Sequence, residues 1–184
     1  MRIHLSFFSL SLLIFLSACH SQSTNSRGTD SDQNNPAQAI PQPNYDYSVE
    51  VPENWTLIDT IMEGRLRIRI LLPPAPMKTD NPTVNILIAY MEGRNISDYT
   101  TANIDYLKTN MPGITILEKG NMDSSIYGGK WFTYTKEQDG LIRELINYII
   151  PFNGFAYQVT CGTNRGSMNK YRVIFDKIAG SFKG

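Results

Sequence analysis

Apolar and polar positions alternate most clearly in the C-terminal half of the chain, where three apolar runs follow one another. Two turn-forming dipeptides separate the runs, giving the order Lys130–Lys136, Asp139-Gly140, Leu141–Ile150, Asn153-Gly154 and Phe155–Cys161. Asp-Gly and Asn-Gly pairs favour two-residue type I′ turns, because both central residues of that turn have positive φ. The pattern therefore predicts a three-stranded antiparallel meander.

Two-residue turns would also fix which residues lie opposite one another. The expected rows across the meander are Trp131–Tyr148–Val159, Thr133–Ile146–Cys161 and, on the other face, Phe132–Asn147–Thr160. The middle strand, LIRELINYII, has large apolar residues on both faces. We therefore expect it inside a sheet that is covered on both sides.

The rest of the domain continues with strand and helix patterns. Further strands are predicted at Tyr45–Val51, Trp55–Asp59, Arg65–Leu72, Thr83–Tyr90 and Ile114–Lys119. A first helix should begin at Ser97 as N-cap and end before Pro112-Gly113. A second helix should carry the apolar stripe Met168, Tyr171, Ile174, Phe175 and Ile178. The expected fold class is α+β, an α/β/α sandwich with a mainly antiparallel sheet and helices on both faces.

Two short features have both a structural and a binding interpretation. Arg65, Arg67 and Arg69 alternate with aliphatic residues, so they could grip phosphate or carboxylate groups, but we expect the solvated face of an outer strand. The turn 162–167 ends in Gly-Ser before a helix and could hold an anion. It lacks the lysine of a phosphate loop, so we expect a plain turn with a helix cap.

The N-terminus has the features of a bacterial lipoprotein precursor. Residues 1–18 combine a short basic start with the twelve-residue apolar stretch Leu5–Leu16, which suits a signal peptide better than a membrane span. Leu16-Ser17-Ala18-Cys19 resembles the lipobox. This resemblance implies that the mature chain begins at Cys19 and is anchored through lipid on that residue. An ordinary secretory peptide is the alternative.

Residues 19–43 should form a flexible tether. They contain one large aliphatic residue, Ile40, among mostly Ser, Gln, Asn, Asp and Pro. Such a segment cannot bury enough apolar surface to offset the entropy of ordering. The globular domain is therefore expected to span residues 44–184.

Composition narrows the possible chemistry. Seventeen basic and seventeen acidic side chains balance, which disfavours a nucleic-acid partner. The two histidines, His4 and His20, precede the domain, so no histidine-based catalytic set or zinc site can form within it. No calcium-loop spacing occurs. Cys161 is expected to be a buried structural thiol. We predict no metal, no cofactor and no catalytic residue.

The remaining route to catalysis is through carboxylates. The candidates for this alternative, a hydrolytic enzyme of the cell envelope, are Glu118, Asp123, Asp139 and Glu144. Glu144 shares its strand face with Ile146, Tyr148 and Ile150. A carboxylate at the end of an apolar row is either paired with a cation or has a raised pKa.

A partner could dock on the other face of the meander. There the expected register brings together Tyr134, Arg143, Asn147 and Gln158, which are too polar for a sealed core unless every group is hydrogen-bonded. Tyrosine and arginine are enriched at binding hot spots. The alternative is that a helix or the proline-rich loop 73–82 covers this face.

Four stretches together resemble the PsbP-like domain family, which includes DcrB- and PsbP-related bacterial lipoproteins. They are YSVEVPENW at Tyr47–Trp55, the helix start Ser97-Asp98-Tyr99, YGGKWFTYT at Tyr127–Thr135, and FAYQVTCGTN with YRVIFDKIAGSF at the end. The resemblance implies a sheet with helices on both faces and a non-enzymatic role. We therefore expect an envelope lipoprotein on the periplasmic or outer-membrane face, which binds or assists an envelope protein or complex.

Overall fold

The computed structural model describes residues 41–62, 66–74, 80–138 and 140–184 of the chain. Residues 42–184 form one compact unit. The predicted signal peptide, the tether up to residue 40, the lipid site Cys19 and the turn residue Asp139 lie outside the described residues. Among the described helices, none is long and apolar enough to cross a bilayer.

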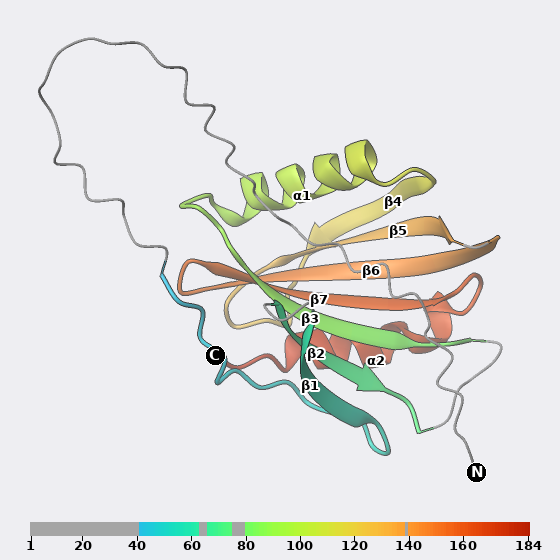
Figure 1. Ribbon diagram of the computed structural model, residues 1–184, viewed down its shortest axis with the longest axis horizontal. Coiled ribbons are helices and arrows are strands. Elements are labelled where there is room, and N and C mark those ends of the chain that lie inside the picture. The colour runs from blue at the N-terminus through green and yellow to red at the C-terminus, as the bar shows by residue number, and fades with distance from the viewer. Residues whose placement is uncertain (1–40, 63–65, 75–79, 139) are drawn as a thin grey trace, which may run out of the picture. The chain divides into compact units, whose positions relative to one another are not determined.

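The domain is a single antiparallel sheet with one helix on each face (Figure 1). In spatial order the strands are β1-β2-β3-β7-β6-β5-β4. Their bounds are β1 Thr56–Met62, β2 Leu66–Leu72, β3 Thr83–Tyr90, β4 Ile114–Asn121, β5 Lys130–Gln138, β6 Leu141–Phe152 and β7 Phe155–Asn164. The helices are α1 Ile96–Asn110, between β3 and β4, and α2 Met168–Gly180, at the end of the chain. The predicted α+β sandwich is confirmed.

The meander has the predicted register. Tyr148 lies opposite Trp131 and Val159, and Asn147 lies opposite Phe132 and Thr160. The β6–β7 turn has φ of 49° at Asn153 and 80° at Gly154, the positive values that a type I′ turn requires. The dipeptide therefore sets the pairing of the two longest strands.

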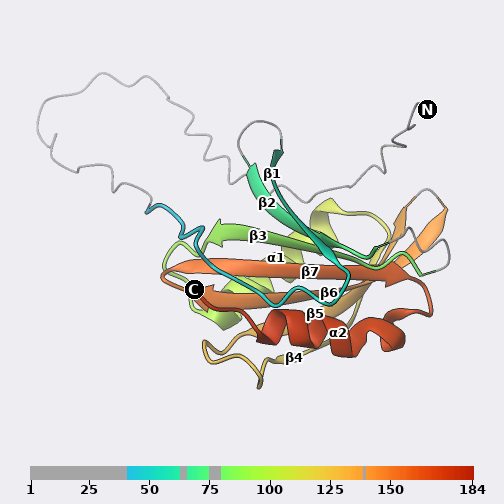
Figure 2. The same cartoon turned by 90° about the horizontal axis from the view of Figure 1, so that it is seen from below.

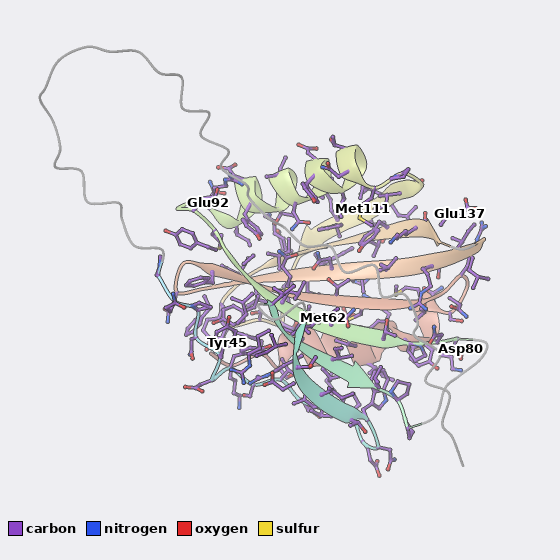
Figure 3. The ribbon with its side chains drawn as sticks, viewed as in Figure 1. Tyr45, Met62, Asp80, Glu92, Met111 and Glu137 are labelled. Atoms are coloured by element: carbon purple, nitrogen blue, oxygen red, sulfur yellow. The ribbon has the colours of Figure 1, made fainter. Side chains whose placement is uncertain are left out.

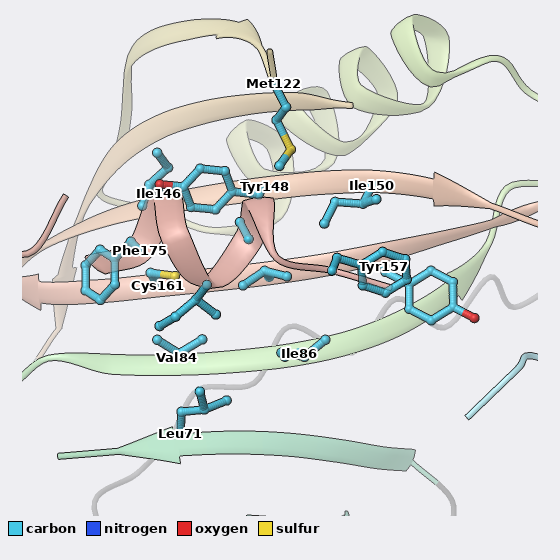
Figure 4. Close-up of a cluster of buried hydrophobic side chains, with 14 of the residues drawn as sticks. Leu71, Val84, Ile86, Met122, Ile146, Tyr148, Ile150, Tyr157, Cys161 and Phe175 are labelled. Carbon is cyan, nitrogen blue, oxygen red and sulfur yellow. The ribbon is translucent and has the colours of Figure 1, made fainter. Parts of the chain in front are cut away.

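The apolar core lies between the sheet and α2, and Figure 2 shows α2 running along β6 and β7. Every second residue of the central strands points into this core, which Figure 4 shows in detail. The helix contributes Tyr171, Phe175, Ile178 and Ala179 to it, and the sheet contributes Leu71, Val84, Ile86, Ile146, Tyr148, Ile150, Tyr157, Val159 and Cys161. Burial of the apolar surface of these side chains is the main stabilising contribution to the fold.

The opposite face of the sheet is partly covered by α1, which packs on β4, β5 and β6. Its helix begins two residues earlier than expected. Asn95 is the N-cap, and its Oδ1 accepts hydrogen bonds from the amides of Ser97 and Asp98 at 2.9 and 3.0 Å. The expected N-cap, Ser97, is wrong because the preceding asparagine reaches both amides.

The predicted strand at Tyr45–Val51 is also wrong. This segment makes only one isolated bridge, between Ser48 and Lys183. The carbonyls of Tyr45 and Tyr47 instead accept hydrogen bonds from the guanidinium of Arg69. A side chain thus takes the place of a neighbouring strand, and no ladder can form there.

Of the predicted arginine row, Arg65 lies outside the described residues, Arg67 is exposed as expected, and Arg69 is less exposed than expected. The Arg69 side chain is only 15% exposed, since it lies beneath Tyr47, with its guanidinium carbon 4.1 Å from the ring centroid. Arg67 and Arg69 both donate to the Asp59 carboxylate, at 2.8–3.2 Å. The outer strand is β1, and the row on β2 grips a carboxylate of the chain itself.

Candidate functional site

A cleft of about 240 Å³ lies between the first turn of α2 and the β4 side of the sheet, and we call it the α2–β4 cleft. It is lined by Leu117, Glu118, Thr133, Tyr134, Glu144, Leu145, Gly166, Met168, Asn169 and Arg172. Two of the four candidate carboxylates, Glu118 and Glu144, are therefore brought to one cleft. Asp123 is not among the lining residues, and Asp139 lies outside the described part of the chain.

Glu144 is used to hold the start of α2. Its Oε2 accepts a hydrogen bond from the backbone amide of Met168 at 3.3 Å. Ser167, the N-cap residue, gives this helix no side-chain cap of its own. An ionised carboxylate suits the positive end of a helix dipole. The expected turn 162–167 is shorter in the structure, because β7 continues to Asn164, and residues 165–167 lead into a helix whose N-terminus receives the chain's own carboxylate.

Arg172 forms the opposite wall of the cleft and is held from two sides. Its Nε donates to Asp176 at 2.9 Å, and its guanidinium lies 4.5 Å from the centre of the Trp131 ring. The Tyr148 hydroxyl also donates to Asp176, at 2.6 Å. Burial raises the pKa of Tyr148 far above its usual value, so this hydroxyl remains a donor. The cleft wall is therefore tied to the centre of the meander.

Glu118 is the carboxylate that the cleft leaves available. Its backbone amide donates to the Thr133 hydroxyl at 3.1 Å, at the bulge between Ile116 and Lys119. Its side chain is exposed and takes part in none of the ion pairs found among the described residues. The geometry suits the binding of a basic or amide-bearing group, with Glu118 as its acceptor.

The domain's one thiol is enclosed. Cys161 is fully buried, and burial raises the pKa of its thiol well above the usual value, which suits a structural role. In the described part of the chain, no three Asp, Glu, His or Cys side chains lie close enough to hold a metal ion.

The face expected to form an open docking surface is covered by α1. Tyr134, Asn147 and Gln158 are all buried. Asn103 of the helix donates from Nδ2 to the Gln158 Oε1 at 3.2 Å, and Gln158 donates to the Tyr99 hydroxyl at 2.9 Å. The alternative in which a helix covers the face therefore describes the structure. A partner could reach Asn147 and Gln158 only if α1 moved.

Arg143 is separated from this group and holds the loop before β3. Its guanidinium donates to the carbonyl of Asn81 at 3.1 Å and to the hydroxyl of Thr83 at 3.2 Å. Burial lowers the pKa of Arg143 from its usual value. Of the four residues of the expected docking face, three are thus buried on the side covered by α1, and Arg143 holds the loop before β3.

Asp80 is a key residue that the sequence pattern missed, since it lies in the proline-rich loop that we expected to be a plain connection or a cover. Figure 3 labels it at the same end of the sheet as Glu137. Its carboxylate accepts hydrogen bonds from the Ser167 and Tyr171 hydroxyls, both at 3.1 Å, and from the Lys170 ammonium. We call this set the Asp80 clamp. It joins the loop before β3 to the first turn of α2, through helix residues that do not themselves line the cleft.

The Asp80 clamp should make stability depend on pH. The hydrogen bond from Lys170 holds the pKa of the Asp80 carboxyl below its usual 3.8. A depressed folded-state pKa contributes stability above the unfolded-state pKa, and that stability is lost as pH falls through the folded value. Asp80→Asn should therefore melt at a lower temperature than wild type at pH 7, with the difference shrinking below about pH 4.

Thermal melts at both pH values test this expectation. Asp105→Asn, which changes an exposed aspartate of α1, is the matched control and should leave the melting temperature unchanged at either pH. A difference for Asp80→Asn that persists undiminished in acid would show that the carboxylate charge is not its source.

Comparison with solved structures identifies the fold. LpqN from Mycobacterium tuberculosis, described as involved in cell envelope biogenesis, matches with a TM-score of 0.57 at 14% identity, covering 74% of this chain and 82% of LpqN. The solution structure of cyanobacterial PsbP (CyanoP) from Synechocystis sp. PCC 6803 matches with a TM-score of 0.54 at 12% identity, covering 74% of this chain and 85% of CyanoP.

A protein of unknown function from Pseudomonas aeruginosa, PA94, matches with a TM-score of 0.52 at 16% identity, covering 66% of this chain and 91% of that protein. No family model and no curated protein matches the sequence. The shared property is thus the arrangement of strands and helices. The domain of this chain has the PsbP-like fold.

Proposed function

We propose that this chain is a lipid-anchored accessory protein of a bacterial cell envelope, and that its PsbP-like domain acts by binding a protein partner. The observation that carries the proposal is the combination of a lipobox-like sequence ending at Cys19 with this fold in one chain. The likeness to LpqN, whose description places it in cell envelope biogenesis, supports the same setting.

The α2–β4 cleft is the proposed contact site. It presents Glu118 beside the apolar Leu117, on an edge of the sheet where a partner can approach. Glu144 and Arg172 are both engaged in holding α2, which supports binding over the alternative of carboxylate-dependent hydrolysis. A lysine or arginine side chain of the partner is the group that best complements an exposed carboxylate.

The anchor is tested by Cys19→Ser. Without the thiol no thioether to lipid can form, so the variant should accumulate as a longer precursor, while wild type partitions into detergent and takes up labelled fatty acid. Cys161→Ala is the matched control, since it removes the other cysteine and should leave processing unchanged. Recovery of wild type with a free, unacylated N-terminus would overturn the proposed anchor.

The contact site is tested in the same cells with a photo-crosslinking residue at position 118. We expect it to capture an envelope protein, whereas the same residue at the exposed position Ile126 should not. Equal capture from both positions, or capture from neither, would contradict a contact at the cleft.

A further inference from the structure

The two edges of the sheet are protected to very different degrees. An edge strand exposes unpaired N–H and C=O groups that can pair with another strand, and proteins usually block this with charges, bulges or a covering element. The edge strand β4 has all three: a bulge between Ile116 and Lys119, charged side chains at Glu118 and Lys119, and the packing of α1. This edge is closed to strand addition.

Within the described residues, the edge strand β1 has no bulge and no covering helix, and Asp59 is its one charged residue. It pairs with β2 over all seven residues without a break in register, and its sequence, TLIDTIM, contains no proline and no lysine. Leu57 and Ile61, on one face of the strand, are 41% and 63% exposed, and Ile58 on the other face is 39% exposed. The apolar residues on this edge are therefore open to a partner.

The one charge on β1 is already compensated. Asp59 accepts hydrogen bonds from Arg67 at 2.8 and 2.9 Å and from Arg69 at 3.2 Å. Both guanidinium groups come from β2, on the inner side of the strand. The charge thus does not block the outer edge as an unpaired carboxylate would.

The sequence of β1 complements itself when it is reversed. Antiparallel pairing of two copies centred on Asp59 would place Leu57 opposite Ile61 of the second copy, twice by symmetry. On the other face, Ile58 would lie opposite Thr60, and Thr56 opposite Met62. Registers centred one residue away would place Asp59 opposite Leu57 or Ile61. The centred register therefore joins apolar residues. It also places Asp59 opposite Asp59 of the second copy, where the two arginines bonded to each carboxylate offset the like charges.

We propose that β1 is a homodimer interface, in which two copies of this chain pair their β1 strands antiparallel about Asp59 and form one continuous sheet across the two domains. Main-chain hydrogen bonds along the edge supply the pairing, and the Leu57–Ile61 contacts set the register. Two seven-residue strands bury less area than a standard stable interface, so the dimer should be weak in dilute solution.

Confinement to a membrane would favour such a dimer. Tethering both copies to one surface raises their effective concentration without any new contact. This last step rests on the proposed lipid anchor, whereas the pairing of the strands does not. Dimerisation can therefore be tested whether or not Cys19 is acylated.

The test uses the full chain, held in detergent if it carries lipid, and sedimentation equilibrium at concentrations up to about 0.5 mM, in the range that tethering produces. A basic variant, Leu57→Lys with Ile61→Lys, and an acidic variant, Leu57→Glu with Ile61→Glu, should each raise the dimer Kd by about tenfold or more, because like charges face each other. An equimolar mixture should recover the dimer, because Lys then faces Glu at both positions. The matched control is Leu141→Lys, at a residue of β6 that is 63% exposed and lies outside both the cleft and β1, and it should dimerise as wild type does.

Each outcome decides the proposal. Loss of the dimer in both charged variants together with recovery in the mixture supports it, and recovery also shows that both variants are folded. A wild-type chain that stays monomeric over the whole range overturns it. Charged variants that remain dimeric would place the interface elsewhere, and a mixture that stays monomeric would disprove the register.

Discussion

Phe175→Ala should lower the free energy of unfolding by about 3–5 kcal/mol, the usual range for removing a large buried aromatic side chain. Phe175 is fully buried on the inner side of α2, within the cluster that includes Cys161 and Ile146 (Figure 4). Its ring stacks beside Tyr171, with centroids 6.0 Å apart. A domain of this size is stabilised by only about 5–15 kcal/mol, so the loss should be easily visible in urea denaturation.

The matched control is Val173→Ala, two residues earlier on the same helix. Val173 is 76% exposed, so its truncation should change the free energy of unfolding by no more than about 0.5 kcal/mol. Equal effects of the two substitutions would contradict the packing of α2 described above. A small effect of Phe175→Ala alone would mean that the helix contributes little to the core.

The meander could be predicted from the sequence because its determinants are local. Asn153-Gly154 can form few turns other than type I′, and that turn fixes the partner of every residue on β6 and β7. The alternation of apolar residues then distinguishes the two faces. For the same reason the strand bounds elsewhere were predicted to within a few residues at most, apart from Tyr45–Val51.

The predictions from the sequence were wrong where a side chain distant in sequence takes the hydrogen bonds that the local pattern assigns to the backbone. Arg69 takes the carbonyls of Tyr45 and Tyr47 and so prevents a strand, although the local pattern there favours one. Asp80 lies in a segment rich in proline, and its partners on α2 are about 90 residues away in sequence. Neither contact has a periodic signal that a single sequence could reveal.

The candidate docking face failed for a related reason. The sequence indicated correctly that Tyr134, Asn147 and Gln158 lie on one face, because the register requires it. It left open whether a helix covers that face, since the path of α1 between β3 and the far edge strand β4 depends on the whole topology. The polar residues beneath α1 are thus partners of the helix within the described structure.

These buried polar groups form a small network centred on Gln158. Its Oε1 accepts hydrogen bonds from Asn103 at 3.2 Å and from Asn147 at 3.4 Å, and its Nε2 donates to Tyr99 at 2.9 Å. The amide oxygens of Asn103 and Asn147 accept no hydrogen bond from the described residues. Two buried amide oxygens of the network therefore lack a hydrogen bond. Its stability depends all the more on the hydrogen bonds that are made to Gln158.

Gln158→Leu should accordingly lower the free energy of unfolding by about 2–6 kcal/mol, although leucine has a similar size and is apolar. The substitution leaves the amide nitrogens of Asn103 and Asn147 buried without an acceptor, at about 1–3 kcal/mol for each group. Thr160→Val, two residues further on the same face of β7, is the control and should change stability by less than about 0.5 kcal/mol, because it removes no hydrogen bond of this network. Urea denaturation of both variants measures the difference. A Gln158→Leu chain as stable as wild type would show that the two amides find other partners, and that apolar contact rather than the network holds α1 on the sheet.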